Sequence, residues 1–271
     1  MNFKNKVVLI TGASSGIGKA CAIELAKRGA NLVLAARQYV TLCEITADLE
    51  KTYGIRAIAV QTDVSNEEDC KHLVKQAMTT FDRIDILINN AGLSMRALFK
   101  DLDLSVLKNL MDVNFWGTVY CTKHALPEIL KSKGTIVGVS SIAGYRGLPG
   151  RTGYSASKFA MNGFMEALRT ELLKTGVHVM VACPGFTTSN IRVAALSKDG
   201  NAHGETSMEE GKMMSADEVA ENIINGIAAG KRTLVMTGQG KLTVWLNKLL
   251  PALADSLVFN HFTKEKNALI K

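Results

Sequence analysis

The chain has 271 residues, 47% of them hydrophobic, which is enough to bury one substantial core. The net charge is +7, but the basic residues are spread along the chain without a basic run, which argues against a nucleic-acid-binding protein. The five cysteines lack metal-ligand or CxxC spacing, and no apolar stretch is long enough to span a bilayer, so we expect a cytoplasmic protein without a metal site.

Short apolar runs alternate with longer amphipathic segments. The runs lack a polar–apolar alternation, as is typical of strands buried on both faces of a parallel sheet. Strands are predicted at 7–11, 31–35, 56–61, 84–89, 134–140, 178–183 and 233–236, and helices at 16–28, 40–53, 66–81, 103–130, 154–175 and 216–229. This order predicts one α/β domain over residues 1–238, a doubly wound parallel sheet (Rossmann fold) of about seven strands.

A glycine-rich loop, TGASSGIG, joins the first predicted strand to the first helix. Its spacing suits a cradle for a pyrophosphate: Gly12 permits a tight turn, Gly16 lets the backbone approach the phosphates, and Gly18 allows the helix to pack closely. An ordinary strand–helix loop is the alternative. The position at the first strand–helix junction favours a dinucleotide site, with Ser14, Ser15 and Ile17 also contributing.

The end of the second predicted strand bears on which dinucleotide binds. Sites for NAD place an acidic residue about 20 residues after the glycines. Here the region from 31 to 42 holds no acid and offers Arg37, whose guanidinium can bind a 2′-phosphate. The charge therefore favours NADP(H). The alternative is an ordinary solvated arginine after a strand, which would give the same sequence.

Tyr154 and Lys158 stand one turn apart on a predicted helix, so their side chains share one face. Such a pair can simply share a solvated helix face. It can also be a catalytic pair, because a nearby ammonium favours the phenolate and lowers the pKa of tyrosine.

Taken together, these motifs resemble the tyrosine-dependent short-chain dehydrogenase/reductase family, in its form of about 250 residues. The resemblance covers residues from about 6 to 237. The motifs that carry it appear in order: TGASSGIG, NNAG at 89–92, Asn114, Ser141, Tyr154 with Lys158, and PG at 184–185.

The resemblance implies a catalytic group of four residues. Tyr154 would be the general acid/base, and Lys158 would also bind the nicotinamide ribose. Ser141 would donate a hydrogen bond to the substrate oxygen. Asn114, a poor helix former, would distort its helix and hold a water that connects Lys158 to solvent.

The resemblance also implies further contacts to NADP(H). Asp63 and Val64 would flank the adenine. The remaining contacts would come from the loops after the fourth and sixth strands, from Asn90, Ala91, Gly92, Pro184, Gly185, Thr187 and Ser189. Threonine is commoner in the family at the position of Ser189, which leaves only fine geometry open.

The polar stretch 190–214 is long and weakly periodic, and we expect a substrate lid there. Five residues, Ser94, Met95, Arg96, Tyr145 and Leu148, are expected to border the substrate pocket. The C-terminal extension 239–271 is apolar with lysines around it. We expect amphipathic helices, interrupted at Pro251, that pack or oligomerise; a peripheral membrane contact is the alternative.

The sequence thus predicts an NADPH-dependent oxidoreductase that reduces the carbonyl of an apolar small-molecule substrate. That substrate could be lipid-like, such as a 3-keto sphingoid base or ketoacyl chain, or steroid-like. A homodimer or homotetramer is expected from the family. Two alternatives stay open: a non-catalytic NADP(H)-binding regulator, and an NAD-linked alcohol dehydrogenase.

Overall fold

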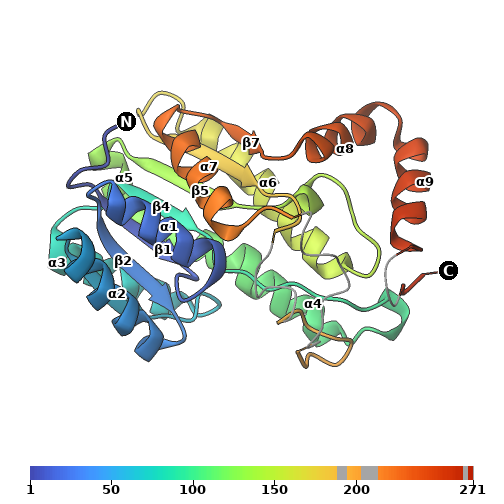
Figure 1. Cartoon of the computed structure of the whole chain (residues 1–271), viewed down its shortest axis with the longest axis horizontal. Coiled ribbons are helices and arrows are strands. Elements are labelled where there is room, and N and C mark those ends of the chain that lie inside the picture. Colours follow the sequence, from blue (N-terminus) through green and yellow to red (C-terminus); the bar gives the residue numbers. More distant parts are fainter. Residues whose placement is uncertain (188–193, 203–212, 265–267, 271) are drawn as a thin grey trace.

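A seven-stranded parallel sheet forms the centre of the molecule in a computed structural model, which describes residues 1–187, 194–202, 213–264 and 268–270 (Figure 1). The strand order is β3-β2-β1-β4-β5-β6-β7. The strands are β1 (Val7–Thr11), β2 (Asn31–Ala36), β3 (Ala57–Gln61), β4 (Ile86–Asn89), β5 (Thr135–Val139), β6 (His178–Cys183) and β7 (Thr233–Val235). The doubly wound fold predicted from the sequence is confirmed.

Helices cover both faces of the sheet. The helices are α1 (Gly16–Lys27), α2 (Tyr39–Tyr53), α3 (Glu67–Phe81), α4 (Leu104–Met111), α5 (Gly117–Ser132), α6 (Thr152–Glu171), α7 (Ala216–Ala228), α8 (Gly238–Leu249) and α9 (Pro251–Phe262), with short turns η1 (Phe99–Asp101) and η3 (Ile142–Gly144). One buried cluster joins α1, α2 and α7 to the sheet. The other joins α3, α5 and α6 to the opposite face. Strands buried on both sides explain the uninterrupted apolar runs.

The direction of winding reverses between β1 and β4. These two strands pair in parallel, with Leu9 beside Leu87, yet one chain crossover leads to β2 and the other to β5. Loops after the two strands diverge at such a switch point and leave a crevice at the carboxyl edge. The glycine loop and the NNAG motif therefore meet there.

The helix predicted at 103–130 is in fact interrupted. A π-helical turn, η2 (Asp112–Trp116), separates α4 from α5 and holds Asn114 at its middle. The interruption expected from Asn114 is thus present in the structure. The helix predicted to begin at 154 begins at Thr152.

Two helices, α8 and α9, follow the sheet as an arm at the end of the molecule away from α2 and α3 (Figure 1). The expected interruption falls at Pro251, the first residue of α9. Among the described residues, no helix is both long and apolar enough to cross a membrane. Within one chain the apolar face of the arm is largely exposed, with Leu242, Trp245, Leu249, Leu250, Leu253, Leu257 and Phe259 open to solvent.

Candidate active site

The glycine loop is shaped by its contact with the neighbouring strand. Gly12 has a φ of +65°, and a Cβ there would lie 2.8 Å from the Cα of Ala91. A Cβ on Gly18 would lie 2.3 Å from the carbonyl oxygen of Gly12. Neither position can accept a side chain without moving backbone.

Asn90 holds this loop in place. Its Nδ2 donates to the carbonyl oxygens of Thr11 (2.9 Å) and Gly12 (3.2 Å). In return, the hydroxyl of Thr11 accepts from the backbone amides of Asn90 and Ala91, both at 3.0 Å. Sequence reasoning placed Asn90 at the cofactor and overlooked Thr11, which was visible as the last residue of the first predicted strand.

The first turn of α1 is open for an anion. Ser15 caps the helix without a side-chain hydrogen bond, so the first backbone amides have no partner in the helix. These amides border a cavity that adjoins a second one lined by Tyr154 and Lys158, since Ile17, Asn90, Gly92 and Ser94 line both parts of the crevice. An elongated crevice with an anion site at its centre fits a dinucleotide.

Most of the residues predicted to bind the cofactor line this crevice. The outer part is lined by Gly12, Ser14, Ser15, Gly16, Ile17, Arg37, Asp63, Val64, Asn90, Ala91 and Gly92. The inner part is lined by Ser141, Tyr154, Lys158, Pro184, Gly185 and Thr187. Gly18 lies behind the loop as a packing contact, and Ser189 is outside the described residues.

Arg37 is exposed at the outer end of the crevice, beside Gln38. The Oγ of Ser14 donates to the side chain of Gln38 at 2.8 Å, a contact that the sequence did not indicate. Among the described residues of this lining, only Asp63 carries a carboxylate. Its Oδ1 accepts from the backbone amide (3.0 Å) and the hydroxyl (2.7 Å) of Ser65.

Asn114 is fully buried where the π-helical turn η2 meets the NNAG loop. Its Oδ1 accepts from the backbone amide of Leu93 at 2.7 Å. Its Nδ2 donates to the carbonyl oxygen of Leu93 (2.9 Å) and to the hydroxyl of Ser157 (2.8 Å). A Cβ placed on Gly92 would lie 3.1 Å from Asn114 Oδ1 and 3.5 Å from Lys158 Nζ, so these two polar groups flank one glycine.

Lys158 is buried, with 3% of its surface exposed, and its Nζ donates to the carbonyl oxygen of Val139 at 2.9 Å. Burial lowers the pKa of this ammonium to about 8. The Nζ lies 5.9 Å from the centre of the Tyr154 ring. The lysine and the tyrosine therefore share a buried face, and the solvated-surface interpretation of this pair is wrong.

The phenol of Tyr154 behaves differently from the sequence expectation. Burial raises its pKa above the usual value of tyrosine, and this effect outweighs hydrogen bonding with Ser141 and the charge of Arg151, which lower it. In the protein alone, Tyr154 therefore remains a protonated phenol at neutral pH.

Ser141 caps the turn η3, and its Oγ accepts from the backbone amide of Ala143 at 3.1 Å. Ser141 lines the inner crevice and also an adjoining apolar cavity of about 500 Å³. Apolar side chains of α8 and α9 form much of that cavity, including Leu242, Leu246, Leu257, Val258 and Phe262. The C-terminal arm thus faces the reaction centre.

Two of the five expected border residues line the crevice and three do not. Ser94 and Leu148 line the crevice, as predicted. Arg96 lines a separate small cavity with Pro149 and Phe262. Met95 is instead fully buried in a cluster with Val106 and Leu110, and Tyr145 packs against the sheet. The lid predicted at 190–214 lies partly outside the described residues. In its described part, Leu196 exchanges backbone hydrogen bonds with Ser94 and Arg96.

Comparisons with known proteins agree with this geometry. A family model described as short chain dehydrogenase matches residues 6–200. An Arabidopsis thaliana protein named 11-beta-hydroxysteroid dehydrogenase 1A is 36% identical over 261 residues, which cover 94% of this chain and 74% of that protein. A Danio rerio protein named dehydrogenase/reductase SDR family member 7B is also 36% identical, over 93% of this chain and 84% of that protein.

Solved structures show the same fold. A short-chain dehydrogenase/reductase from Burkholderia phymatum in complex with NAD superposes with a TM-score of 0.83 at 26% identity, over 93% of this chain and 96% of that chain. A short-chain dehydrogenase from Sphingobium yanoikuyae in complex with NADPH gives a TM-score of 0.78 at 26% identity, over 92% and 96% of the two chains. This chain therefore belongs to the short-chain dehydrogenase/reductase family of oxidoreductases.

Proposed function

We propose that the protein is an NADPH-dependent carbonyl reductase for ketones on an apolar, steroid-like or lipid-like skeleton. One observation carries this proposal: Ser141, Tyr154 and Lys158 line the inner end of a dinucleotide crevice, and that end opens into an apolar cavity of about 500 Å³. This volume suits a ligand of steroid size. Relatives named 11-beta-hydroxysteroid dehydrogenase support the steroid-like class.

The four polar residues have complementary parts in the proposed reduction. Bound NADPH supplies a hydride to the carbonyl carbon. Tyr154, protonated because of its burial, donates its proton to the carbonyl oxygen as negative charge develops there. Ser141 donates a hydrogen bond to the same oxygen, which stabilises that charge. The product is the corresponding alcohol.

Lys158 and Asn114 support the proton donor. The ammonium of Lys158 keeps its charge at neutral pH and favours the phenolate that remains after proton transfer. Asn114 fixes Leu93 and Ser157, and Ser157 Oγ in turn donates to the carbonyl oxygen of Tyr154 at 2.8 Å. We propose that Asn114 also orders a water beside Gly92, through which Lys158 exchanges protons with solvent.

The preference for NADPH rests on charge at the outer end of the crevice. Arg37 is exposed there and can bind a 2′-phosphate, while one oxygen of the Asp63 carboxylate, Oδ1, accepts from Ser65. Structural neighbours bind either NAD or NADPH, so the fold alone does not decide. Arg37→Leu should weaken NADPH binding by about tenfold and leave NADH binding unchanged, as measured by fluorescence titration of each cofactor.

The direct test is NADPH consumption over a panel of ketones that includes steroid ketones and a 3-keto sphingoid base, with NADH in parallel. Tyr154→Phe should lower turnover by about 10²- to 10⁴-fold and keep NADPH binding. Absent turnover with tight NADPH binding would instead favour a non-catalytic regulator. A clear preference for NADH would favour an NAD-linked alcohol dehydrogenase.

We also propose that the protein forms a homodimer or homotetramer. Trp116 at the start of α5, Phe159 on α6 and Leu173 after it are exposed in the single chain. Large exposed apolar side chains on neighbouring helices are typical of subunit interfaces. Light scattering on the purified protein should give two or four times the mass of one chain, and a monomer at micromolar concentration would contradict this proposal.

A further inference from the structure

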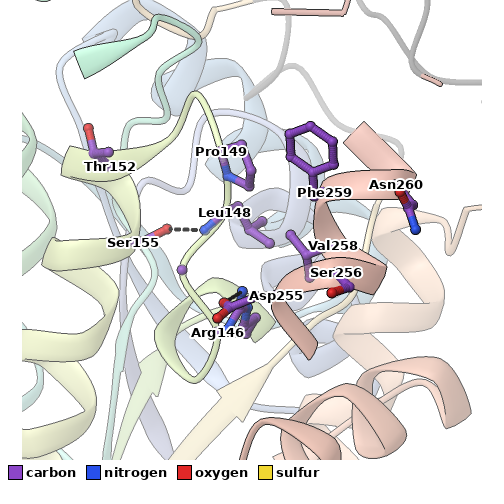
Figure 2. Close-up of a pocket in the computed structure, with 11 residues that line it drawn as sticks. Arg146, Leu148, Pro149, Thr152, Ser155, Asp255, Ser256, Val258, Phe259 and Asn260 are labelled. Carbon is purple, nitrogen blue, oxygen red and sulfur yellow. Dashed lines mark hydrogen bonds and ion pairs between the residues drawn. The ribbon is translucent and has the colours of Figure 1, made fainter. Parts of the chain in front are cut away.

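A second open groove lies on the far side of the apolar cavity. It measures about 870 Å³ and runs between the loop before α6 and the outer face of α9. Figure 2 shows Leu148 and Pro149 on one wall, and Val258 and Phe259 on the other. These four side chains give the groove an apolar strip, and polar side chains of Thr152, Ser155, Ser256 and Asn260 line the rest of it.

The groove adjoins the reaction centre through shared lining residues. Leu148 lines the groove, the apolar cavity and the inner crevice that holds Tyr154. Val258 lines both the groove and the apolar cavity. A single long ligand can therefore pass from Ser141 along Leu148 and out between the two walls.

One side chain fixes the outer wall. Arg146, in the loop before α6, donates through Nη1 to Asn247 Oδ1 on α8 at 2.9 Å and forms an ion pair with Asp255 on α9. Asn247 also donates to the carbonyl oxygen of Tyr145 at 2.9 Å. Arg146 and Asp255 lie together at one end of the groove (Figure 2). One guanidinium thus connects both helices of the arm to the body of the protein.

The contacts of Arg146 are better explained by a role in positioning α8 and α9 than by a contribution to stability. Its Nε is buried and has no hydrogen-bond partner among the described residues, which costs free energy. Asp255 is 70% exposed, and pairs with an exposed partner contribute little to stability. A planar guanidinium that reaches two helices at once gives a fixed spacing between them, which an ammonium cannot do equally well.

We propose that Arg146 is a specificity-determining residue that holds α8 and α9 as the outer wall of an extended substrate site, so that the protein selects elongated apolar ketones. The carbonyl end lies at Ser141 and Tyr154, and the far end of the carbon skeleton lies between Leu148 and Phe259. The inference rests on the proposed ketone reduction and adds the length and shape of the substrate.

The test compares Arg146→Met, Arg146→Lys and Asp255→Asn on straight-chain methyl ketones of increasing length. In the unaltered protein, kcat/KM should rise with chain length. Arg146→Met should raise KM for long ketones about tenfold and leave kcat and the values for short ketones unchanged. Asp255→Asn should raise the same KM by about twofold to fivefold, and Arg146→Lys should fall between the two.

A binding measurement separates this inference from the proposed reduction. The dissociation constant of a pyrene-labelled long-chain ketone, measured by fluorescence in the presence of NADPH, should rise about tenfold in Arg146→Met even if no ketone is turned over. The control is Glu128→Gln, which breaks the Glu128–Lys131 ion pair on α5 and should change neither measurement.

Two results would overturn the inference. Equal losses for short and long ketones would place the effect of Arg146 at the reaction centre instead of the groove. Unchanged binding of the labelled ketone in both Arg146→Met and Asp255→Asn would show that the groove takes no part of the substrate. Melting temperatures of all variants, compared with Glu128→Gln, exclude unfolding as the cause of a change.

Discussion

Lys158 at the carboxyl edge of the sheet is 3% exposed, whereas Leu249 on α8 is 59% exposed. The comparison inverts the usual placement of charged and apolar side chains. At the sheet edge, polar groups are buried and held by hydrogen bonds from several strands and helices. On the arm, apolar groups are open to solvent, and a few polar contacts through Arg146 connect them to the body. The side chains at the edge are therefore held by the core, while the arm depends on a few specific contacts.

The largest effect on stability is expected at the sheet edge, where the backbone at Gly18 packs against the backbone of Gly12. Gly18→Ala would place a Cβ 2.3 Å from the Gly12 carbonyl oxygen and 2.5 Å from Asn90 Nδ2. We expect a loss of about 3 kcal/mol or more in the free energy of unfolding and loss of NADPH binding. Urea unfolding and fluorescence titration measure the two effects.

Gly163→Ala is the matched control, because a Cβ on this exposed glycine of α6 meets nothing within 4 Å. Alanine is the better helix former, so the free energy of unfolding should rise by about 0.5–1 kcal/mol. If the two substitutions had similar effects, the close packing of the glycine loop would not be what shapes the cofactor site.

The next largest effect is expected at Asn114. Asn114→Leu keeps the size of the side chain but takes the Asn114 partner from the partly buried backbone amide and carbonyl of Leu93. We expect a loss of about 2–4 kcal/mol in the free energy of unfolding, together with lower turnover. Asn222→Leu, on the exposed side of α7, should change the free energy of unfolding by less than about 0.5 kcal/mol. Equal costs at the two positions would contradict the role given to Asn114.

The contacts of Asn114 also show why the sequence could predict only part of this site. Buried strands and the glycine loop follow from local patterns, since apolar runs and glycine spacing are visible within a few residues. The π-helical turn depends on partners 21 and 43 residues away from Asn114, and no local pattern reports them. The resemblance to a family indicated the distortion, whereas propensity alone showed only that asparagine is a poor helix former.

Two further features could not be predicted from the sequence, because they also depend on residues far apart in the chain. The raised pKa of Tyr154 comes mainly from desolvation of its phenol in the folded protein, whereas the sequence showed only the nearby lysine. Arg146 meets residues 101 and 109 positions further along the chain, so its role as a bridge between α8 and α9 appears only in the folded protein. The sequence motifs predicted the catalytic and cofactor-binding residues, whereas the substrate cavity is defined by tertiary contacts.

A smaller effect is expected from pH. A lysine is charged below its pKa, and burial brings the pKa of Lys158 down to about 8, so its charge is present at neutral pH and disappears as the pH rises through that value. The raised pKa of Tyr154 keeps the phenol protonated over the same range. We therefore expect kcat/KM for ketone reduction to be constant near neutral pH and to fall above about pH 8.

Lys158→Arg serves as the comparison for this profile, because a guanidinium stays charged well above pH 8. Its residual activity should lack the fall near pH 8, whatever its absolute level. A wild-type profile that stays flat through pH 9 would show that the charge of Lys158 is not required, or that NADPH binding moves its pKa upward.

The smallest effect is expected on the arm. The same substitution, leucine to alanine, can be compared at a buried position in the body and at an exposed position on the arm. Leu110 is fully buried beside Met95 and Val106, so Leu110→Ala should lower the free energy of unfolding by about 2–5 kcal/mol. Leu249→Ala removes a side chain that folding leaves mostly in water, and it should cost less than about 0.5 kcal/mol in urea unfolding at low protein concentration. Similar costs for the two leucines would mean that a partner covers the arm in solution. The contrast between a buried sheet edge and an open arm would then hold for the single chain and fail for the assembled protein.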